Sequence, residues 1–326
     1  MKRSYLNMPV RSNLRYILLI IISIGLTLAW AQNEDAGSTG FNSLKMVHGA
    51  RAMALGQALT GEAKNPDGLF FNPAAIIELP NKEVGTTYCN YFLDTQGGQI
   101  RLLLPKDKFS AWAFGLQYMN MGSFERTEVD QFGNFIDDLG TFGASNLIAT
   151  ASLAKFISPA IDAGGSVKVI YDMLDDTSAA AVLLDLGIIH HPHNEKVKVG
   201  VTMRNIGLQL KYYTENKHKE KLPFTFTAGG SYTYTPQHKS FLEFHKANGE
   251  NFTARFGHEY MLTPDFALRA GFRSNAGDWN SGGGWGWTSG LSLGAGWKYK
   301  AYKIDYAASS YGDLGLVNQL TLSYSF

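Results

Sequence analysis

Three histidines lie close together at His190, His191 and His193, with Pro192 between them. Imidazole nitrogens bind transition metals, and short histidine-rich tracts can form metal sites. Glu195 is the one carboxylate at ligand spacing beside them, and the tract falls in a predicted tight turn between strands. A solvated turn is the favoured interpretation, so we predict no metal and no cofactor.

A glycine-rich stretch, Gly282 to Trp287, raises the question of phosphate binding. A phosphate loop follows a strand, precedes a helix and carries a Lys-Ser/Thr pair. Here strand patterns lie on both sides and no such pair follows. We therefore expect a flexible external loop, with Trp285 and Trp287 near a membrane interface.

Charged side chains of both signs recur on one face of the predicted strands. They are Lys168, Asp172, Lys198, Arg204, Arg255, Glu259, Arg269, Arg273 and Asp305. One interpretation is a polar channel in which Arg204, Arg255, Arg269 and Arg273 bind a carboxylate ligand. The favoured alternative is a set of structural ion pairs that fills the lumen, because charges of both signs are present.

The sequence pattern contains no recognisable catalytic set. No Ser/His/Asp arrangement stands in a familiar context. Cys89 is the single cysteine, so an intrachain disulfide is impossible, and its apolar alternating surroundings indicate a packed thiol. We predict a protein that is not an enzyme.

Composition separates this chain from most soluble proteins. Charged residues are 17% and aromatic residues 13% of the 326 residues, which is poor in charge and rich in aromatics. Lys and Arg (29) balance Asp and Glu (28), so a nucleic-acid partner is not expected.

The first residues have the pattern of an export signal. A basic start (Lys2, Arg3) leads into the apolar stretch Ile17 to Leu28, and Ala29-Trp30-Ala31 supplies the small residues of a cleavage site. The apolar run is short for a transmembrane helix, which needs about 20 residues. We predict a signal peptide at 1–31, cleaved after Ala31.

From about residue 83 onward, apolar and small polar residues alternate with period two, as in strands that separate two environments. Clear examples are Val197 to Arg204, Phe224 to Thr235, Phe266 to Arg273 and Leu291 to Tyr299. These strands look longer than the usual five or six residues, roughly ten or more. A soluble sandwich would also alternate, but its strands would be shorter.

The connections alternate between short and long. Short turns, most with proline, follow about every second strand, as at Ser158-Pro159-Ala160 and Thr235-Pro236-Gln237-His238. Long connections are Met121 to Gly143, Gly207 to Leu222 and Ser274 to Trp287. This pattern is typical of a transmembrane β-barrel with periplasmic turns and extracellular loops, and about fourteen strands fit residues 83–326.

The last residues, Gln319 to Phe326, read QLTLSYSF and form a strictly alternating strand. A barrel in lipid must close so that no edge remains unpaired. We expect this strand to pair with the first one. Its Leu, Tyr and Phe residues would then face lipid, while Thr321, Ser323 and Ser325 face the lumen.

Residues 32–82 have a different character and are predicted to fill the lumen as a hatch. Ser43 to Leu59 has helix-like apolar spacing, weakened by Gly49 and Gly56. A turn and the segment Phe70-Phe71-Asn72-Pro73-Ala74-Ala75 follow. About fifty residues are too few for a second domain but enough for a plug.

Three blocks resemble the PorV/PorQ family, within the wider superfamily of FadL-type outer-membrane transporters. They are Gly49 to Ile76 with the triplet Asn72-Pro73-Ala74, Tyr118 to Ser145, and Asn205-Ile206-Gly207 followed by Leu222-Pro223-Phe224. The resemblance covers nearly the whole mature chain, although Asn72-Pro73-Ala74-Ala75 departs from the commoner NPAG form. It implies a fourteen-stranded outer-membrane barrel with an N-terminal hatch.

The resemblance also implies two alternative functions. PorV/PorQ proteins act in type IX secretion, where they dock secretion-system subunits or exported cargo proteins. FadL proteins admit long-chain fatty acids or other hydrophobic small molecules through an opening in the barrel wall. A third, weaker possibility is a porin-like protein.

Aromatic residues on the predicted loops favour the docking function modestly. Among them are Phe124, Phe132, Tyr212, Trp279 and Trp285. Exposed aromatic side chains are enriched at partner surfaces. We therefore predict docking through the loops, with a channel for hydrophobic molecules as the alternative.

Overall fold

The computed structural model describes residues 37–326 except 78, 137–138, 276–278 and 280–282. Fourteen antiparallel strands close into a barrel, in the order β1-β16-β15-β14-β13-β12-β11-β10-β9-β8-β7-β6-β3-β2. The predicted fold class is therefore confirmed. The predicted signal peptide, 1–31, lies outside the described residues.

The barrel strands run from residue 83 to residue 325. They are β1 (Glu83–Asn90), β2 (Gln96–Pro105), β3 (Ser110–Glu125), β6 (Thr141–Ser158), β7 (Ile161–Leu174), β8 (Thr177–His190), β9 (Val197–Lys211), β10 (Thr225–Thr235), β11 (His238–Ala247), β12 (Thr253–Thr263), β13 (Phe266–Arg273), β14 (Leu291–Tyr299), β15 (Tyr302–Ser310) and β16 (Leu316–Ser325). Short helices are η1 (Asn42–Lys45), α2 (Ala50–Ala54), α3 (Gly68–Phe71), η2 (Pro73–Ile76), η4 (Gly286–Thr288) and η5 (Gly312–Leu314). Among the described residues, no helix is both long and apolar enough to cross a membrane.

The last strand closes the barrel as its alternation predicts. β16 pairs with β1, and Leu322 lies opposite Thr86. Leu322 is 45% exposed on the outer face, whereas Thr321 is 3% exposed inside. An apolar outer face on a closed barrel is the surface that a bilayer requires.

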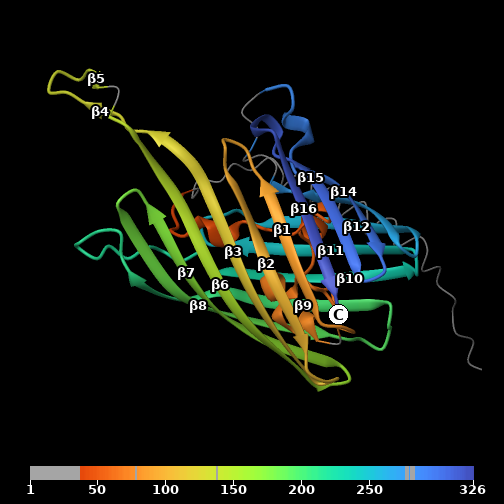
Figure 1. Ribbon diagram of the computed structural model, residues 1–326. Coiled ribbons are helices and arrows are strands. Elements are labelled where there is room, and N and C mark those ends of the chain that lie inside the picture. The colour runs from red at the N-terminus through yellow and green to blue at the C-terminus, as the bar shows by residue number, and fades with distance from the viewer. Residues whose placement is uncertain (1–36, 78, 137–138, 276–278, 280–282) are drawn as a thin grey trace, which may run out of the picture.

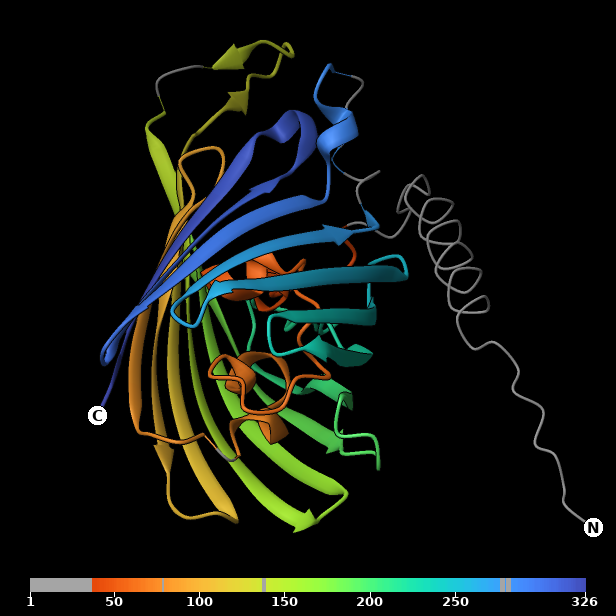
Figure 2. The same ribbon diagram turned by 90° about the vertical axis from the view of Figure 1, so that its right-hand side faces the viewer.

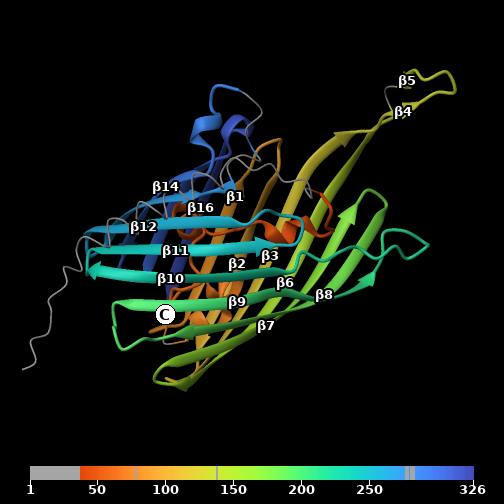
Figure 3. The same cartoon turned by 180° about the vertical axis from the view of Figure 1, so that it is seen from behind.

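Strand length differs strongly around the barrel. β6 has 18 residues and β3 has 16, whereas β13 has 8. The long strands carry a two-stranded hairpin, β4 (Glu128–Val129) and β5 (Phe135–Ile136), well away from the barrel (Figures 1 and 3). The end with the longer connections is called the long-loop end below.

Two predicted long loops are shorter than expected, because strand structure continues into them. β3 extends to Glu125 and β9 to Lys211. Phe124, predicted on a loop, therefore lies in β3, with its ring 5.4 Å from that of Phe142 in β6. Cross-strand aromatic pairs of this kind stabilise a ladder and extend it.

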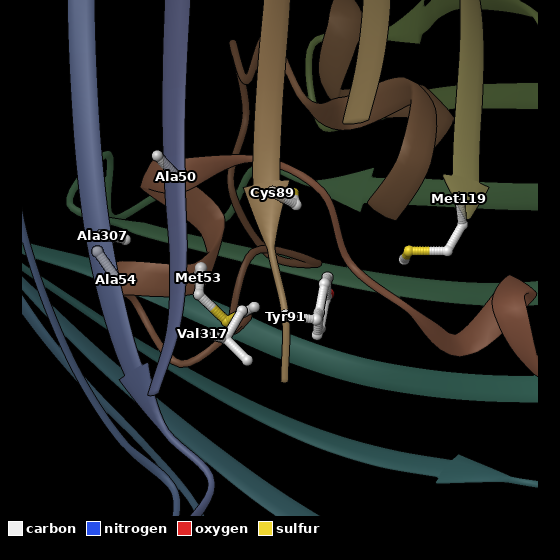
Figure 4. Close-up of a cluster of buried hydrophobic side chains, with 8 residues drawn as sticks. All are labelled: Ala50, Met53, Ala54, Cys89, Tyr91, Met119, Ala307 and Val317. Atoms are coloured by element: carbon white, nitrogen blue, oxygen red, sulfur yellow. The ribbon is translucent and has the colours of Figure 1, made fainter. Parts of the chain in front are cut away.

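Residues 37–82, called the plug below, run through the inside of the barrel (Figure 2). Helix α2 contacts β13, β14, β15 and β16, and η2 contacts β3, β6, β7 and β8. Met53 of α2 packs with Cys89, Tyr91, Met119 and Val317 of the barrel in a buried apolar cluster (Figure 4). Cys89 is buried and free, in accord with a packed thiol.

The helix-like spacing of Ser43 to Leu59, which Gly49 and Gly56 weaken, corresponds to an α-helix of only five residues, α2. Gly49 precedes it with φ 136° and Gly56 follows with φ 62°, and both values break a helix. A Cβ on Gly56 would also lie 2.6 Å from the carbonyl oxygen of Phe256. Close approach of the plug to the wall therefore overrides the apolar spacing.

Candidate functional site

A buried ionic network ties the plug to one side of the barrel. Arg51 of α2 lies 2.6 Å from Glu62 and 3.0 Å from Glu259 of β12. Glu259 is also 2.6 Å from Arg269 of β13, which lies 2.7 Å from Asp305 of β15. Arg269, a predicted ligand-binding residue, thus has two acid partners. Such ion pairs fix the plug relative to the barrel wall, because separating the partners would leave a buried charge without a counter-charge.

Further ion pairs act at other points of the wall. Arg101 of β2 lies 2.9 Å from Asp67 of the plug. Lys168 of β7 lies 2.8 Å from Asp185 of β8. These contacts fit the prediction that many inward charges are structural.

The triplet Asn72-Pro73-Ala74 lies on the inner wall. The Asn72 side-chain amide donates to the carbonyl oxygens of Thr60 (2.8 Å) and Ile188 (3.1 Å). Its oxygen accepts from the backbone N–H of Ala74 (3.1 Å), which caps η2. The triplet therefore joins two parts of the plug to β8.

Glycines of the wall make room for this contact. A Cβ on Gly187 of β8 would lie 2.1 Å from the Asn72 side-chain oxygen. A Cβ on Gly200 of β9 would lie 2.0 Å from the carbonyl oxygen of Thr60. Both positions require glycine, because real Cβ atoms do not approach so closely.

The stretch Leu44 to His48, called the upper plug below, lies nearer the long-loop end. Tyr91 and Gln319 donate to the carbonyl oxygen of Val47, at 3.1 Å and 2.8 Å. The Gln319 side-chain oxygen accepts from the backbone N–H of Gly49 at 2.7 Å. Two neutral barrel side chains thus hold Val47 and its surroundings.

A cavity of about 170 Å³, called the outer cavity below, lies on one side of the upper plug. Its apolar lining is Met46, Val47, Tyr91, Phe92, Trp279 and Tyr311, and its charged lining is Lys45, Glu250, Arg255 and Arg273. The lining comes from the plug and from strands and connections at the long-loop end. Apolar walls with a few fixed polar groups are typical of small-molecule sites.

A smaller cavity of about 30 Å³, the inner cavity, lies on the other side of the upper plug. Val47, His48, Phe70 and Arg204 are among its lining residues. Arg204 also donates to the carbonyl oxygen of Phe70 at 2.9 Å. Lys45, Met46 and Val47 line both cavities, so the upper plug separates them.

The turn between β11 and β12 anchors the upper plug electrostatically. Glu250 in this turn lies 3.7 Å from Lys45 and 3.4 Å from His245. Burial by itself raises the pKa of Glu250, but the hydrogen bond and charge of His245 and the charges of Lys45 and Arg255 outweigh it. The pKa of Glu250 falls to about 2.

The predicted loop aromatics divide into two groups. Phe132 is 79% and Trp285 68% exposed, so both can meet a partner. Trp279 instead packs on Tyr311, with ring centroids 4.4 Å apart, and lines the outer cavity. Tyr212 is half-buried and directly follows the last residue of β9, Lys211.

The other two candidate motifs form ordinary loop contacts. His191 lies 2.6 Å from Asp162, and His190 meets the carbonyl oxygen of Ala160 at 3.0 Å. Across the described part of the chain, no group of three or more His, Cys, Asp or Glu side chains could hold a metal ion. In the glycine-rich stretch, the backbone N–H of Gly283 donates to Asp313 at 2.9 Å; Gly282 lies outside the described residues.

Comparisons of sequence return no relative. No family model matches the chain, and no curated protein matches it. The PorV/PorQ resemblance therefore stays a prediction.

Comparison of structures gives a clear answer on the fold. The toluene transporter TodX of Pseudomonas putida superposes with a TM-score of 0.62 at 11% identity, over 85% of this chain and 97% of that chain. The toluene transporter TbuX of Ralstonia pickettii gives 0.58 at 12% identity, over 85% and 97%. A FadL homologue of Pseudomonas aeruginosa gives 0.56 at 11% identity, over 86% and 99%. The chain has the fold of FadL-like outer-membrane transporters. TodX and TbuX are toluene transporters.

Sequence reasoning missed the residues that make the outer cavity. Arg255 and Arg273 were predicted to line a lumen, and they do line this cavity, but Tyr91, Phe92 and Tyr311 were not singled out. The signal was present in the sequence: these aromatics stand at strand ends beside short loops. Their convergence around the upper plug is a tertiary contact that the sequence pattern does not contain.

Proposed function

We propose that this protein is an outer-membrane channel that admits a small hydrophobic compound. The outer cavity carries this proposal, because it offers aromatic and apolar walls beside the upper plug. The FadL-like fold supports it. The compound would enter from the long-loop end and rest in the outer cavity.

Passage from the outer to the inner cavity requires the upper plug to move. Lys45, Met46 and Val47 separate the two spaces, and hydrogen bonds from Tyr91 and Gln319 hold the carbonyl oxygen of Val47. Hydrogen bonds between neutral groups contribute only about 1 kcal/mol each. A shift of this short stretch is therefore far cheaper than displacement of the whole plug.

Native mass spectrometry after gentle detergent extraction tests this proposal. Wild-type protein should retain a hydrophobic compound in stoichiometric amount, and Met46→Trp, which fills the outer cavity, should lose it. Trp285→Ala, on an exposed loop, is the matched control and should retain it. An empty wild-type protein would contradict the channel function.

A docking function of the PorV/PorQ type is the second candidate, and the β4/β5 hairpin favours it. Phe132 and Phe135 are 79% and 74% exposed on a hairpin that stands away from the barrel (Figure 3). Exposed apolar groups of this kind mark partner surfaces. Recovery of secretion-system subunits or cargo with wild-type protein, lost in a Phe132→Ser/Phe135→Ser variant, would support docking.

A further inference from the structure

The outer cavity has more positive charge than a site for a neutral hydrocarbon needs. Lys45, Arg255 and Arg273 line it. Glu250 lies 3.7 Å from Lys45, and Glu243 lies 3.0 Å from Arg255. Within the described part of the chain, no carboxylate lies at ion-pair distance from Arg273. Among the described residues, these three cations face two carboxylates, which leaves one positive charge of the described lining unpaired.

Arg273 is oriented to receive an anion. It is 4% exposed, and its guanidinium carbon lies 4.7 Å from the ring centroid of Trp279 and 4.8 Å from that of Tyr311. Its two side-chain hydrogen bonds go to hydroxyl groups, at 3.4 Å to Tyr311 and 3.2 Å to Ser309. A guanidinium has five N–H donors in one plane. Stacking on the rings fixes that plane and leaves donors for a carboxylate.

Arg255 adds a second, independent sign of an absent ligand. This side chain is 7% exposed, and its Nε has no hydrogen-bond partner among the described residues. A buried donor without a partner is costly, and an acceptor in the cavity would relieve that cost.

Size restricts the ligand to one ring. A cavity of about 150 Å³ is known to hold benzene, and the outer cavity measures about 170 Å³. A benzene ring with one small substituent therefore fits and fills most of this space. The rings of Phe92, Trp279 and Tyr311 suit an aromatic ligand, because offset or edge contacts between rings are favourable.

We infer that the outer cavity binds a small aromatic monocarboxylate, of the size and charge of benzoate. The carboxylate accepts hydrogen bonds from Arg273, and the ring lies among the aromatic side chains. This inference rests on the proposed function, because it names the class of compound that the channel takes. The negative charge distinguishes this ligand from the toluene named for TodX and TbuX.

Calorimetric titration of the purified full-length protein in detergent, with benzoate and separately with toluene, tests the inference. Wild-type protein should bind benzoate more tightly than toluene. Arg273→Met should weaken benzoate binding by about tenfold to a hundredfold, the range for a charge-assisted hydrogen bond, and should leave toluene binding within about twofold. Arg126→Met is the matched control, because Arg126 pairs with Asp175 outside the cavity, and it should change neither.

A second variant keeps the test decisive if Arg273→Met fails to fold. Phe92→Trp adds bulk to the cavity wall and should weaken both ligands without removing charge. Benzoate binding no tighter than toluene binding would overturn the inference and leave the channel proposal intact. Failure of both ligands to bind would contradict the inference and the proposed function together.

Discussion

The lower plug, residues 50–77, and the upper plug, Leu44 to His48, meet the same barrel in different ways. The lower plug is held by ionized groups such as Arg51, and it lies in close contact with wall glycines such as Gly200. The upper plug has a cavity on each side. It is held by neutral hydrogen bonds, by one partly buried ion pair, Lys45–Glu250, and by apolar contacts of Leu44, Met46 and Val47. In the proposed channel, the lower plug has the role of a fixed seal and the upper plug that of a movable partition.

Removing the Arg51 charge should have the largest effect. Arg51→Met leaves Glu62 and Glu259 short of a buried partner, so we expect a loss of about 3–5 kcal/mol in the free energy of unfolding. The temperature at which the folded band disappears in heat-modifiability gels measures this. Arg126→Met, at an exposed pair, should cost less than about 1 kcal/mol; equal effects would mean that the lower plug is not fixed by its charges.

A bulky side chain at Gly200, where the wall touches Thr60, should also loosen the lower plug. Gly200→Val places a side chain against the Thr60 carbonyl, and overpacking of this kind costs about 3 kcal/mol at the upper end of its usual range. Limited proteolysis should then cut the plug faster. Gly284→Val is the control, because nothing lies within 4 Å of a Cβ there. Unchanged cleavage in Gly200→Val would argue that the plug does not rest on β9.

Loosening the upper plug should alter permeability more than stability. Gln319→Met removes the bonds to Val47 and Gly49 and should cost about 1–2 kcal/mol, while uptake of small hydrophobic compounds rises. Proteoliposome uptake measures the second effect. Uptake that stays at the wild-type level would show that the upper plug is as fixed as the lower.

Besides His48, whose burial lowers the pKa of its ring from 6.5 to about 4, acid should act on the upper plug through Glu250. Its pKa is lower in the folded protein (about 2) than its ordinary value of 4.5, so its pairing stabilises the fold above about pH 4.5 and is lost as the pH falls toward 2. Proteolysis with an acid-active protease should detect the upper plug opening between pH 6 and pH 3. Glu250→Gln should reduce the opening below pH 4.5 and leave the part that protonation of His48 adds between about pH 6.5 and pH 4. A variant that opens as far as the wild type at pH 3 would contradict the role of Glu250.

The smallest effect on stability is expected at the β4/β5 hairpin. Phe132→Ser/Phe135→Ser changes side chains that are largely exposed, so the free energy of unfolding should stay within about 0.5 kcal/mol. Heat-modifiability gels check this. A large destabilisation would mean that the hairpin packs on the barrel and is not a free surface.

The strands were predictable because lipid and lumen impose opposite chemistry on alternate residues. Leu322 and Thr321 show this at the closing strand. Their alternation alone predicts which side chain faces lipid and which faces the lumen, without knowledge of tertiary contacts. The plug was less predictable, because α2 ends where Gly56 meets β12 and β13, and such contacts have no local period. The cavity depends on Tyr91 and Tyr311, more than 200 residues apart, converging on the plug.

Hydrogen–deuterium exchange of the full-length protein, read by mass spectrometry on peptides from residues 38–48 and 50–77, tests the central claim most directly. The account predicts fast exchange in the upper plug, slow exchange in the lower plug, and slowing by bound ligand in the upper plug alone. Equal protection of both peptides, unchanged by benzoate or toluene, would contradict a movable partition beside a fixed seal.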